Sequence, residues 1–221
     1  DLSKIYLREI VKNELCEVNG RAENIGYKLK PNDLIEIHVD ESRATAMRPE
    51  NVPIDVRYED DELIVVNKPS GMLVHPTHRD KNGTLLNALS FYLNSANAES
   101  GARYIRAGLV HRLDKQTSGL MVVAKTSRAH RILAEHFKRK IVDKRYVALV
   151  DGVIHEENGT ISAPIGRFAD LKLWNVKEDG KSAKTRFWVK SRTSASTLVE
   201  LEPVTGRTNQ LRIHCASIGH P

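Results

Sequence analysis

The chain has 221 residues and a formal net charge of +6, and 40% of its residues are hydrophobic and 28% charged. This composition is typical of a folded globular protein and excludes a disordered chain. No apolar stretch approaches the roughly 18 to 20 residues of a membrane span, and the opening residues lack a signal peptide's apolar core. Its two cysteines lie far apart, which excludes a disulfide framework and a four-cysteine zinc site. We therefore expect a cytoplasmic protein, and the basic charge favours a polyanionic partner.

Residues 1–42 are predicted to form a small module. Apolar residues at near-helical spacing predict a helix within 2–15. An Asn-Gly pair at 19–20 predicts a tight turn, and alternating apolar residues at 34–39 predict a strand. Residues 43–52 lose this periodicity and are predicted to be a linker.

From residue 53 onward, short apolar runs alternate with helical stretches. The predicted strands are 63–67, 72–74, 120–124, 146–150, 184–190 and 197–204. The predicted helices are 84–93 with Thr84 as its cap, 127 to about 140 with Ser127 as its cap, and one that begins at Thr208. Because strands outnumber helices and come in hairpin-like pairs, we expect an α+β fold with a mixed, mostly antiparallel sheet flanked by helices.

A dense polar loop with the sequence GLVHRLDKQTSG occupies 108–119, between two apolar runs. Loops that are held by a rigid sheet commonly carry catalytic groups. Asp114 has Arg112 and Lys115 as close neighbours in the chain, and opposite charges favour the ionised carboxylate. An ionised carboxylate can serve as a nucleophile or a base. A structural ion-pair turn is the alternative interpretation of the same residues.

Two further stretches carry candidate site residues. In EPVTGRTNQLRIH, a strand end, a glycine turn and a helix start bring Arg207 and Arg212 to one place, which suits phosphate or carboxylate binding. A helix cap with exposed arginines is the alternative. In KRY, Tyr146 enters a strand, where a tyrosine is more often part of the core than a catalyst.

Taken together, these motifs resemble the RluA family of pseudouridine synthases. The resemblance rests on HRLDKQTSG, KRYVAL and PVTGRTNQLRIH, with VVNKPSGMLVHP ahead of them, and it runs from about Pro53 to the last residue. The N-terminal helix, VNGR turn and KLKPNDLIEIHV strand resemble part of an S4-type RNA-binding module, although a generic helix-plus-hairpin cap fits them as well. The family usually continues past a GHP sequence, so we expect the catalytic domain, 53–221, to be truncated at its C-terminal end.

The resemblance implies that uridine in structured RNA is isomerised to pseudouridine. The N1–C1′ bond breaks, the base turns, and C5 bonds to C1′, so no cofactor, metal or second substrate is implied. Asp114 matches the catalytic aspartate of the family. Arg212 matches the arginine that pairs with this aspartate, and Arg207 is a weaker candidate for that pairing. Tyr146 matches the tyrosine that stacks on the target base and is implicated in removal of the C5 proton.

The same resemblance implies a set of residues that bind the substrate. They are His111, Arg112, Lys115, Arg207 and Gln210. The reactive uridine must leave its stack, and Arg112 matches the arginine that holds RNA opened in this way. Basic residues between 125 and 145 are expected to contact phosphates. Asn209 stands where the family often has His, which puts a supporting role of that position in doubt.

The S4-like module favours large-subunit ribosomal RNA as the substrate, with transfer RNA as the alternative, and a monomer is expected. Three other functions are alternative interpretations of the sequence. Five histidines invite a metal site, but no HExxH or CxxC pattern accompanies them. They are His75, His78, His111, His214 and His220. A hydrolase with Ser118 as nucleophile lacks the GxSxG elbow. A non-catalytic RNA-binding protein of the same fold stays open.

Overall fold

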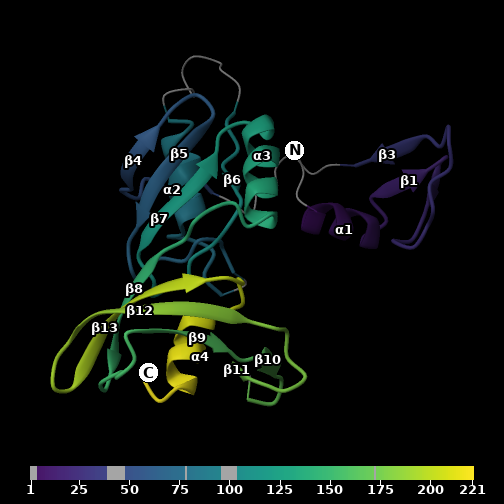
Figure 1. Ribbon diagram of the computed structural model, residues 1–221. Coiled ribbons are helices and arrows are strands. Elements are labelled where there is room, and N and C mark those ends of the chain that lie inside the picture. Colours follow the sequence, from purple (N-terminus) through teal and green to yellow (C-terminus); the bar gives the residue numbers. More distant parts are fainter. Residues whose placement is uncertain (1–3, 39–47, 78, 96–103, 172) are drawn as a thin grey trace. The chain divides into compact units, whose positions relative to one another are not determined.

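The computed structural model describes residues 4–38, 48–77, 79–95, 104–171 and 173–221 (Figure 1). The chain divides into two compact units, Asp1–Arg48 and Pro49–Pro221. The predicted linker spans the boundary between them, and its residues 43–47 lie outside the described residues. Within the described ranges, no helix has the length and apolar character needed to cross a membrane.

The described residues of the first unit, 4–38 and 48, contain one helix and a three-stranded antiparallel sheet. Its elements are α1 (Lys4–Lys12), β1 (Cys16–Val18), β2 (Arg21–Ala22) and β3 (Ile35–Ile37), with strand order β2-β1-β3. The predicted turn is confirmed, because Asn19 and Gly20 have the positive φ angles, 54° and 73°, that a two-residue hairpin loop requires. The side chain of Asn19 also donates to Asp33 and accepts the N–H of Leu34, which ties the hairpin to the segment before β3.

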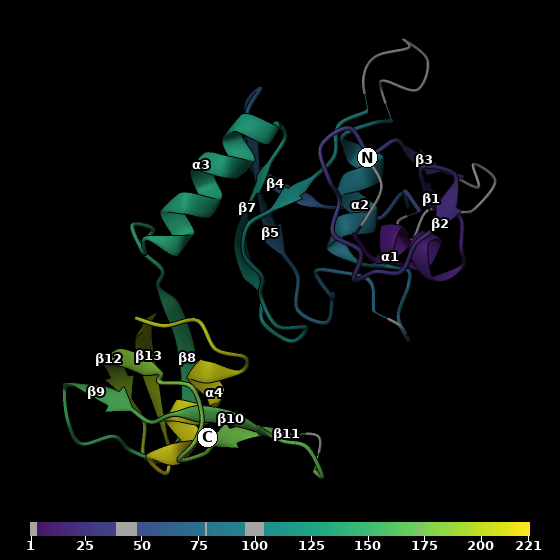
Figure 2. The same cartoon turned by 90° about the vertical axis from the view of Figure 1, so that its right-hand side faces the viewer.

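The second unit is built on two four-stranded sheets, which Figures 1 and 2 show with their helices. One has the order β4-β5-β7-β6, from β4 (Asp55–Glu59), β5 (Leu63–Lys68), β7 (Gly119–Ala124) and β6 (Gly108–Leu109). The other has the order β8-β13-β12-β9, from β8 (Tyr146–Asp151), β13 (Ser196–Pro203), β12 (Lys184–Arg192) and β9 (Asn158–Ser162). A separate two-stranded hairpin is formed by β10 (Ile165–Phe168) and β11 (Leu173–Val176), and β11 lies against α4 (Gln210–Ser217).

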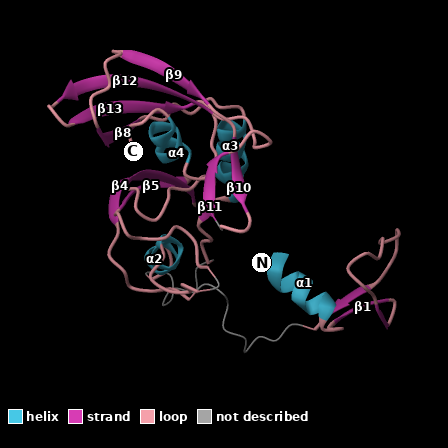
Figure 3. Cartoon of the chain, turned by 90° about the horizontal axis from the view of Figure 1, so that it is seen from below, coloured by secondary structure: helices cyan, strands magenta, loops and turns pink. Residues whose placement is uncertain are grey.

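Helices accompany each of these sheets, as the colouring by secondary structure shows (Figure 3). They are α2 (Leu85–Tyr92) and α3 (Ser127–Lys138) with the β4-β5-β7-β6 sheet, and α4 with the β8-β13-β12-β9 sheet. Every strand pairing among the described residues is antiparallel. The predicted α+β fold with a mostly antiparallel sheet is therefore confirmed, and the predicted pair 184–190 and 197–204 corresponds to β12 and β13.

Two apolar cores account for most of the packing of the second unit. In β5, every second residue is buried, so that one face of the strand, together with the same face of its neighbour β7, packs against α2. The first core contains Ile64, Val66, Leu85, Leu89, Met121 and Val123. The second lies between the other sheet and α4 and contains Val150, Ile161, Phe187, Val199, Leu201 and Cys215.

The cap of α2 is confirmed, but two nearby predictions are wrong. The side-chain oxygen of Thr84 accepts the N–H at the third position of α2, as a helix cap should. The predicted strand at 72–74 does not form, because the carbonyls of Leu73 and Val74 accept N–H groups from the first turn of α2. The cap of α3 is Thr126, not Ser127. Thr126 keeps an extended backbone and its oxygen accepts an N–H of the first turn, whereas Ser127 is already helical.

The start of α4 also differs from the prediction. The predicted helix begins at Thr208, whereas α4 begins two residues later, at Gln210. The intervening Asn209 has a left-handed backbone, with φ 53° and ψ 21°, which a helical residue does not adopt. The chain therefore keeps a turn through 205–208 before it enters the helix.

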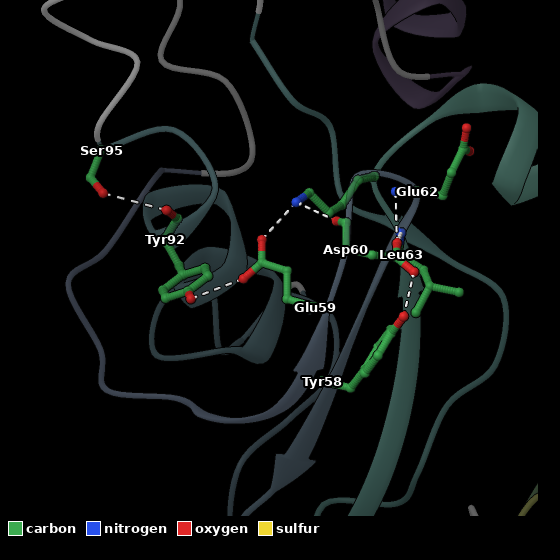
Figure 4. A network of polar contacts seen from close by, with 8 residues as sticks. Tyr58, Glu59, Asp60, Glu62, Leu63, Tyr92 and Ser95 are labelled. Atoms are coloured by element: carbon green, nitrogen blue, oxygen red, sulfur yellow. Dashed lines mark hydrogen bonds and ion pairs between the residues drawn. The ribbon is translucent and has the colours of Figure 1, made fainter.

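A polar network fixes the turn between β4 and β5 (Figure 4). The amine of Lys125 donates to the carboxylate of Glu59 and to the carbonyl of Asp60, each at 2.7 Å. The hydroxyl of Tyr92 donates to the other oxygen of Glu59 at 3.0 Å. This network joins α2 and the end of β7 to the start of β5, whose other end lies at the candidate site.

Candidate active site

The polar loop at 110–118 connects β6 to β7 and is anchored on both sides of Asp114. Leu113 is buried in the first core, and the N–H of Thr117 donates to the carbonyl of Asp114 at 3.1 Å, which closes a tight turn. Gly119 then enters β7 with φ +137°, a backbone conformation that favours glycine. These contacts place Asp114 at a defined, half-buried position.

Lys68 holds this loop, and our sequence analysis did not identify it as a site residue. The side chain is fully buried at the end of β5, and its amine donates to three carbonyls. The acceptors are Pro69 at 2.8 Å, Met72 at 2.8 Å and Lys115 at 3.2 Å. Burial lowers the pKa of Lys68, and the nearby negative charge of Asp114 raises it. Lys68 therefore joins the turn at its own strand end to the loop that carries Asp114.

Backbone contacts reinforce this junction. The N–H of Gly71 donates to the carbonyl of Lys115 at 2.8 Å, and the hydroxyl of Ser70 donates to the carbonyl of Gln116 at 2.8 Å. The sequence held one signal of it, because Lys68 follows the buried Ile64 and Val66 at the two-residue spacing of one strand face. A lysine in phase with buried residues is expected to point inward.

The carboxylate of Asp114 is left open to a ligand. Across the described ranges, no side chain forms a hydrogen bond or ion pair with it. The pKa of the Tyr146 phenol is raised, mainly by burial and in addition by the negative charge of Asp114. The carboxylate therefore affects Tyr146 electrostatically. Tyr146 begins β8 and packs against both cores. Asp114 is therefore within electrostatic range of Tyr146, and the raised pKa keeps the phenol neutral.

Arg212 and Asp114 form no ion pair with each other among the described residues. Arg212 lies on the exposed side of α4, and within the described part of the chain it forms no ion pair. Arg207 does not replace it, because its Nε donates to the carbonyl of Ser182 at 3.1 Å. The predicted pairing of either arginine with Asp114 is therefore not formed here.

Gln210 was predicted to bind substrate, but its amide is used inside the protein. Its Oε1 accepts the hydroxyl of Thr205 at 2.7 Å and the N–H of Arg207 at 3.0 Å. Its Nε2 donates to the carbonyl of Lys184 and the hydroxyl of Thr185, both at 3.0 Å. The side chain is buried, so Gln210 positions the 205–208 turn instead of facing a ligand.

His214 continues this buried network. Its Nδ1 lies 2.8 Å from the Thr185 hydroxyl, and its Nε2 lies 3.0 Å from the carbonyl of Ala163. A carbonyl can only accept, so Nε2 carries the proton and Nδ1 accepts from Thr185. Burial lowers the pKa of His214, which favours this neutral form. The turn and α4 are therefore held to β12 by a chain of satisfied polar groups.

His111, also predicted to bind substrate, has a second structural task. Its Nε2 accepts the N–H of Val122 at 3.1 Å, and its ring stacks on Phe137 with centroids 4.6 Å apart. Burial, helped by the positive charge of Lys144, lowers the pKa of His111 to about 4. A neutral imidazole that accepts a strand N–H and packs on α3 positions the loop and contributes no positive charge to RNA binding.

The remaining predicted residues, Arg112 and Lys115, are exposed. Arg112 lies near His75, whose pKa is lowered by burial and by the charge of this guanidinium. Lys115 contributes its carbonyl to the junction and leaves its side chain exposed. Among the residues with described placement, no three His, Cys, Asp or Glu side chains gather in a way that could hold a metal ion, and His78 lies outside them.

Comparison with known proteins identifies the family of the chain. A family model described as RNA pseudouridylate synthase matches residues 62–217. The chain belongs to this family. It is 40% identical over 225 residues to an uncharacterized RNA pseudouridine synthase of Aquifex aeolicus, covering all of this chain and 71% of that protein. It is 37% identical over 223 residues to the ribosomal large subunit pseudouridine synthase D of Haemophilus influenzae, covering all of this chain and 67% of that protein.

A solved structure supports the same assignment. Human RNA pseudouridylate synthase domain containing 1 matches with a TM-score of 0.65 and 29% identity, over 79% of this chain and 69% of that chain. The family and its named members are pseudouridine synthases, so the chain is an RNA-modifying isomerase.

Proposed function

We propose that this pseudouridine synthase modifies uridines of large-subunit ribosomal RNA and that Asp114 is its reacting carboxylate. The observation that carries the proposal is a half-buried carboxylate without a protein partner among the described residues, on a loop that Lys68 fixes from within. The choice of RNA is supported by relatives that are named ribosomal large subunit pseudouridine synthase D and match the whole chain.

The chemistry needs a carboxylate of this kind. Isomerisation breaks the N1–C1′ bond and forms a C5–C1′ bond, and the proton lost from C5 is balanced by the proton gained at N1. Attack on C1′, attack on C6 and removal of a sugar proton all require a carboxylate whose lone pairs are free. Asp114 meets this requirement, and the atom balance needs no second substrate.

Tyr146 is proposed to stack on the extruded uracil. A neutral phenol is a weak base, and the raised pKa of Tyr146 keeps it in this form. Its ring packs against both cores, and we propose that it offers the extruded base a flat apolar face. Stacking on such a face offsets part of the few kcal/mol that unstacking a base costs.

Arg212 is proposed to become the ionic partner of Asp114 only when RNA is bound. The guanidinium is exposed and, within the described ranges, has no acid to pair with, so it is available for this role. A pairing formed in the complex would keep the carboxylate charged after the base has displaced water from the site.

Phosphate contacts are proposed for those basic residues between 106 and 144 that form no ion pair with an acidic side chain within the described residues. Four basic residues between 125 and 145 are paired with Glu side chains, and these are Lys125, Lys138, Arg139 and Arg145. Seven basic residues between 106 and 144 have no ion pair among the described residues: Arg106, Arg112, Lys115, Arg128, Arg131, Lys140 and Lys144. Of these, Arg112 lies two residues before Asp114 on the same loop, and we propose that it holds the opened RNA.

Conversion of defined RNAs tests the proposal. Unmodified transcripts of bacterial large-subunit ribosomal RNA and of transfer RNAs are incubated with the chain, and pseudouridine is mapped by base-specific chemical labelling. We expect conversion at one or a few positions of the ribosomal transcript. Conversion of transfer RNA alone would move the enzyme to the other substrate class, and binding without conversion of either RNA would contradict the proposed activity.

Residues 1–42 are proposed to add RNA affinity as an S4-like module. A chain that begins at residue 49 keeps the whole second compact unit. We expect it to bind the ribosomal transcript several-fold more weakly and to convert saturating RNA at an unchanged rate. Full retention of affinity would remove the RNA-binding role from the first unit.

A further inference from the structure

A pocket of about 420 Å³ opens between the β10–β11 hairpin and the turn before α4. The volume is within the range of small-molecule sites. Its lining includes the side chains of Arg167, Trp174, Lys177, Asp179, Lys181 and Arg207. The single acid among them, Asp179, forms an ion pair with Lys177 at 2.9 Å. The lining keeps a net positive charge, so it favours an anionic ligand.

Arg167 and Trp174 line this pocket side by side. They lie directly opposite each other in the β10–β11 ladder, so their side chains share one face of the hairpin. Both are exposed, and Arg167 has no ion pair or side-chain hydrogen bond within the described ranges. An unpaired guanidinium suits a phosphate, and an exposed indole beside it suits a stacked base.

The hairpin is held in place before any ligand arrives. Ile165, at 1% exposure, packs with Ala183 and with Ile213 of α4. The backbones of Ile165 and Lys181 exchange two hydrogen bonds at 2.9 Å. At Gly180 an added Cβ would lie 2.6 Å from the carbonyl carbon of Ile165, so only glycine fits this close approach. The pocket is therefore preformed, which limits the entropy lost on binding.

We propose that this pocket binds a nucleotide of the substrate RNA that flanks the reactive uridine, with its base on Trp174 and its phosphate on Arg167. The proposal rests on the proposed function, because it takes single-stranded RNA as the ligand. The turn that lines the pocket leads directly into α4, the helix that carries Arg212. A nucleotide bound here would fix the RNA strand against the same element that is proposed to complete the reaction site.

Fluorescence of the full chain tests the proposal with a hexamer of uridylate as the probe. The chain contains two tryptophans, so Trp188→Phe leaves Trp174 as its only indole. We expect the oligonucleotide to quench this variant saturably, and Trp174→Phe, which leaves Trp188, to show little quenching.

Two variants separate the phosphate contact from the stack. Arg167→Ala should weaken binding about fivefold or more and reduce the slope of log K against log salt concentration by about 0.7, the value for one phosphate contact on a single strand. Trp174→Leu should weaken binding about tenfold and leave the slope unchanged. Lys190→Ala, which removes a positive charge outside the pocket, should change neither quantity.

The outcomes show separately whether this pocket binds RNA and whether the chain has the proposed activity. Because Arg167 is exposed and unpaired within the described residues, its replacement is not expected to disturb folding. Wild-type affinity and salt slope in both variants would overturn the pocket. If ribosomal transcript is converted with unchanged KM by both, the activity stands and the pocket fails. If the oligonucleotide quenches Trp174 as expected but no RNA is converted, the pocket stands and the activity fails.

Discussion

The loop at 110–118 and the turn at 205–208 present motif residues in the same way but are held by different chemistry. A buried ammonium, Lys68, holds the loop by donating to three carbonyls. A buried neutral amide, Gln210, holds the turn with four hydrogen bonds. In each case a buried polar side chain forms its hydrogen bonds within the protein and fixes the backbone of a segment that carries motif residues. Loss of Lys68, the charged anchor, is expected to cost more than loss of Gln210, the neutral anchor, because hydrogen bonds from a charged donor contribute more free energy than those of a neutral amide.

The largest stability effect is expected from the charged anchor. Lys68→Met keeps the apolar stem but leaves the carbonyls of Pro69, Met72 and Lys115 without this donor, so we expect the free energy of unfolding to fall by about 3 kcal/mol. Turnover should fall as well, because the loop that carries Asp114 is loosened. Denaturant unfolding measures the first effect.

Lys115→Met is the matched control for this variant. It also removes a lysine, but one whose exposed side chain takes no part in the junction, and we expect a change within about 0.5 kcal/mol. Equal stability losses in the two variants would show that burial of Lys68 is not what fixes the loop.

The neutral anchor should give a smaller loss. Gln210→Leu keeps the volume but removes the partners of Thr205, Arg207 and Thr185, and we expect about 2 kcal/mol less stability. Gln116→Leu, at an exposed position of the other loop, should change stability by less than about 0.5 kcal/mol. If Gln210→Leu instead raised KM for RNA with full stability, Gln210 would be a substrate contact after all.

His111 makes the first loop sensitive to acid. Its pKa in the folded protein is about 4, below the ordinary 6.5, so the unfolded chain binds the extra proton first as pH falls. Stability is therefore lost as pH falls below 6.5, and the loss stops growing below about 4. Between pH 7.5 and 5 we expect this group to contribute a loss of about 1–2 kcal/mol.

His111→Gln tests that assignment because it retains an acceptor near the position of Nε2 without the titration. The acid-side loss, measured by denaturant unfolding at each pH, should shrink relative to wild type. His75 and His214 titrate in both proteins, so the difference between the two curves isolates His111. Identical curves would contradict a buried neutral His111.

Local patterns in the sequence predicted the main elements well. Alternating or continuous apolar runs correspond to β5, β7, β8, β12 and β13, and the threonine at 84 caps α2. The short strands β4, β6, β9, β10 and β11 were not predicted, because they carry few buried residues and owe their form to a neighbouring strand. The segment at 72–74 looks like a strand by composition, but its carbonyls are taken by a helix end.

The candidate site shows the limit of reading motifs from residue type. His111, Arg112 and Gln210 are all polar members of family-like motifs, yet two point inward and one is exposed. Which way each points depends on partners distant in the chain, such as Val122 or Thr185, and no local pattern reveals them. Lys68 differs from these residues, because its phase with Ile64 and Val66 indicates that it points inward, but its third acceptor lies 47 residues away and could not be predicted.

We propose that the free carboxylate of Asp114 is the reacting group and that Tyr146 and Arg212 assist it. Single-turnover conversion of ribosomal transcript by Asp114→Asn tests this directly, with RNA affinity measured on the same preparation. We predict that conversion falls by on the order of 10³-fold or more while affinity for RNA stays within a few-fold of wild type. Conversion at near wild-type rate by Asp114→Asn would contradict the account.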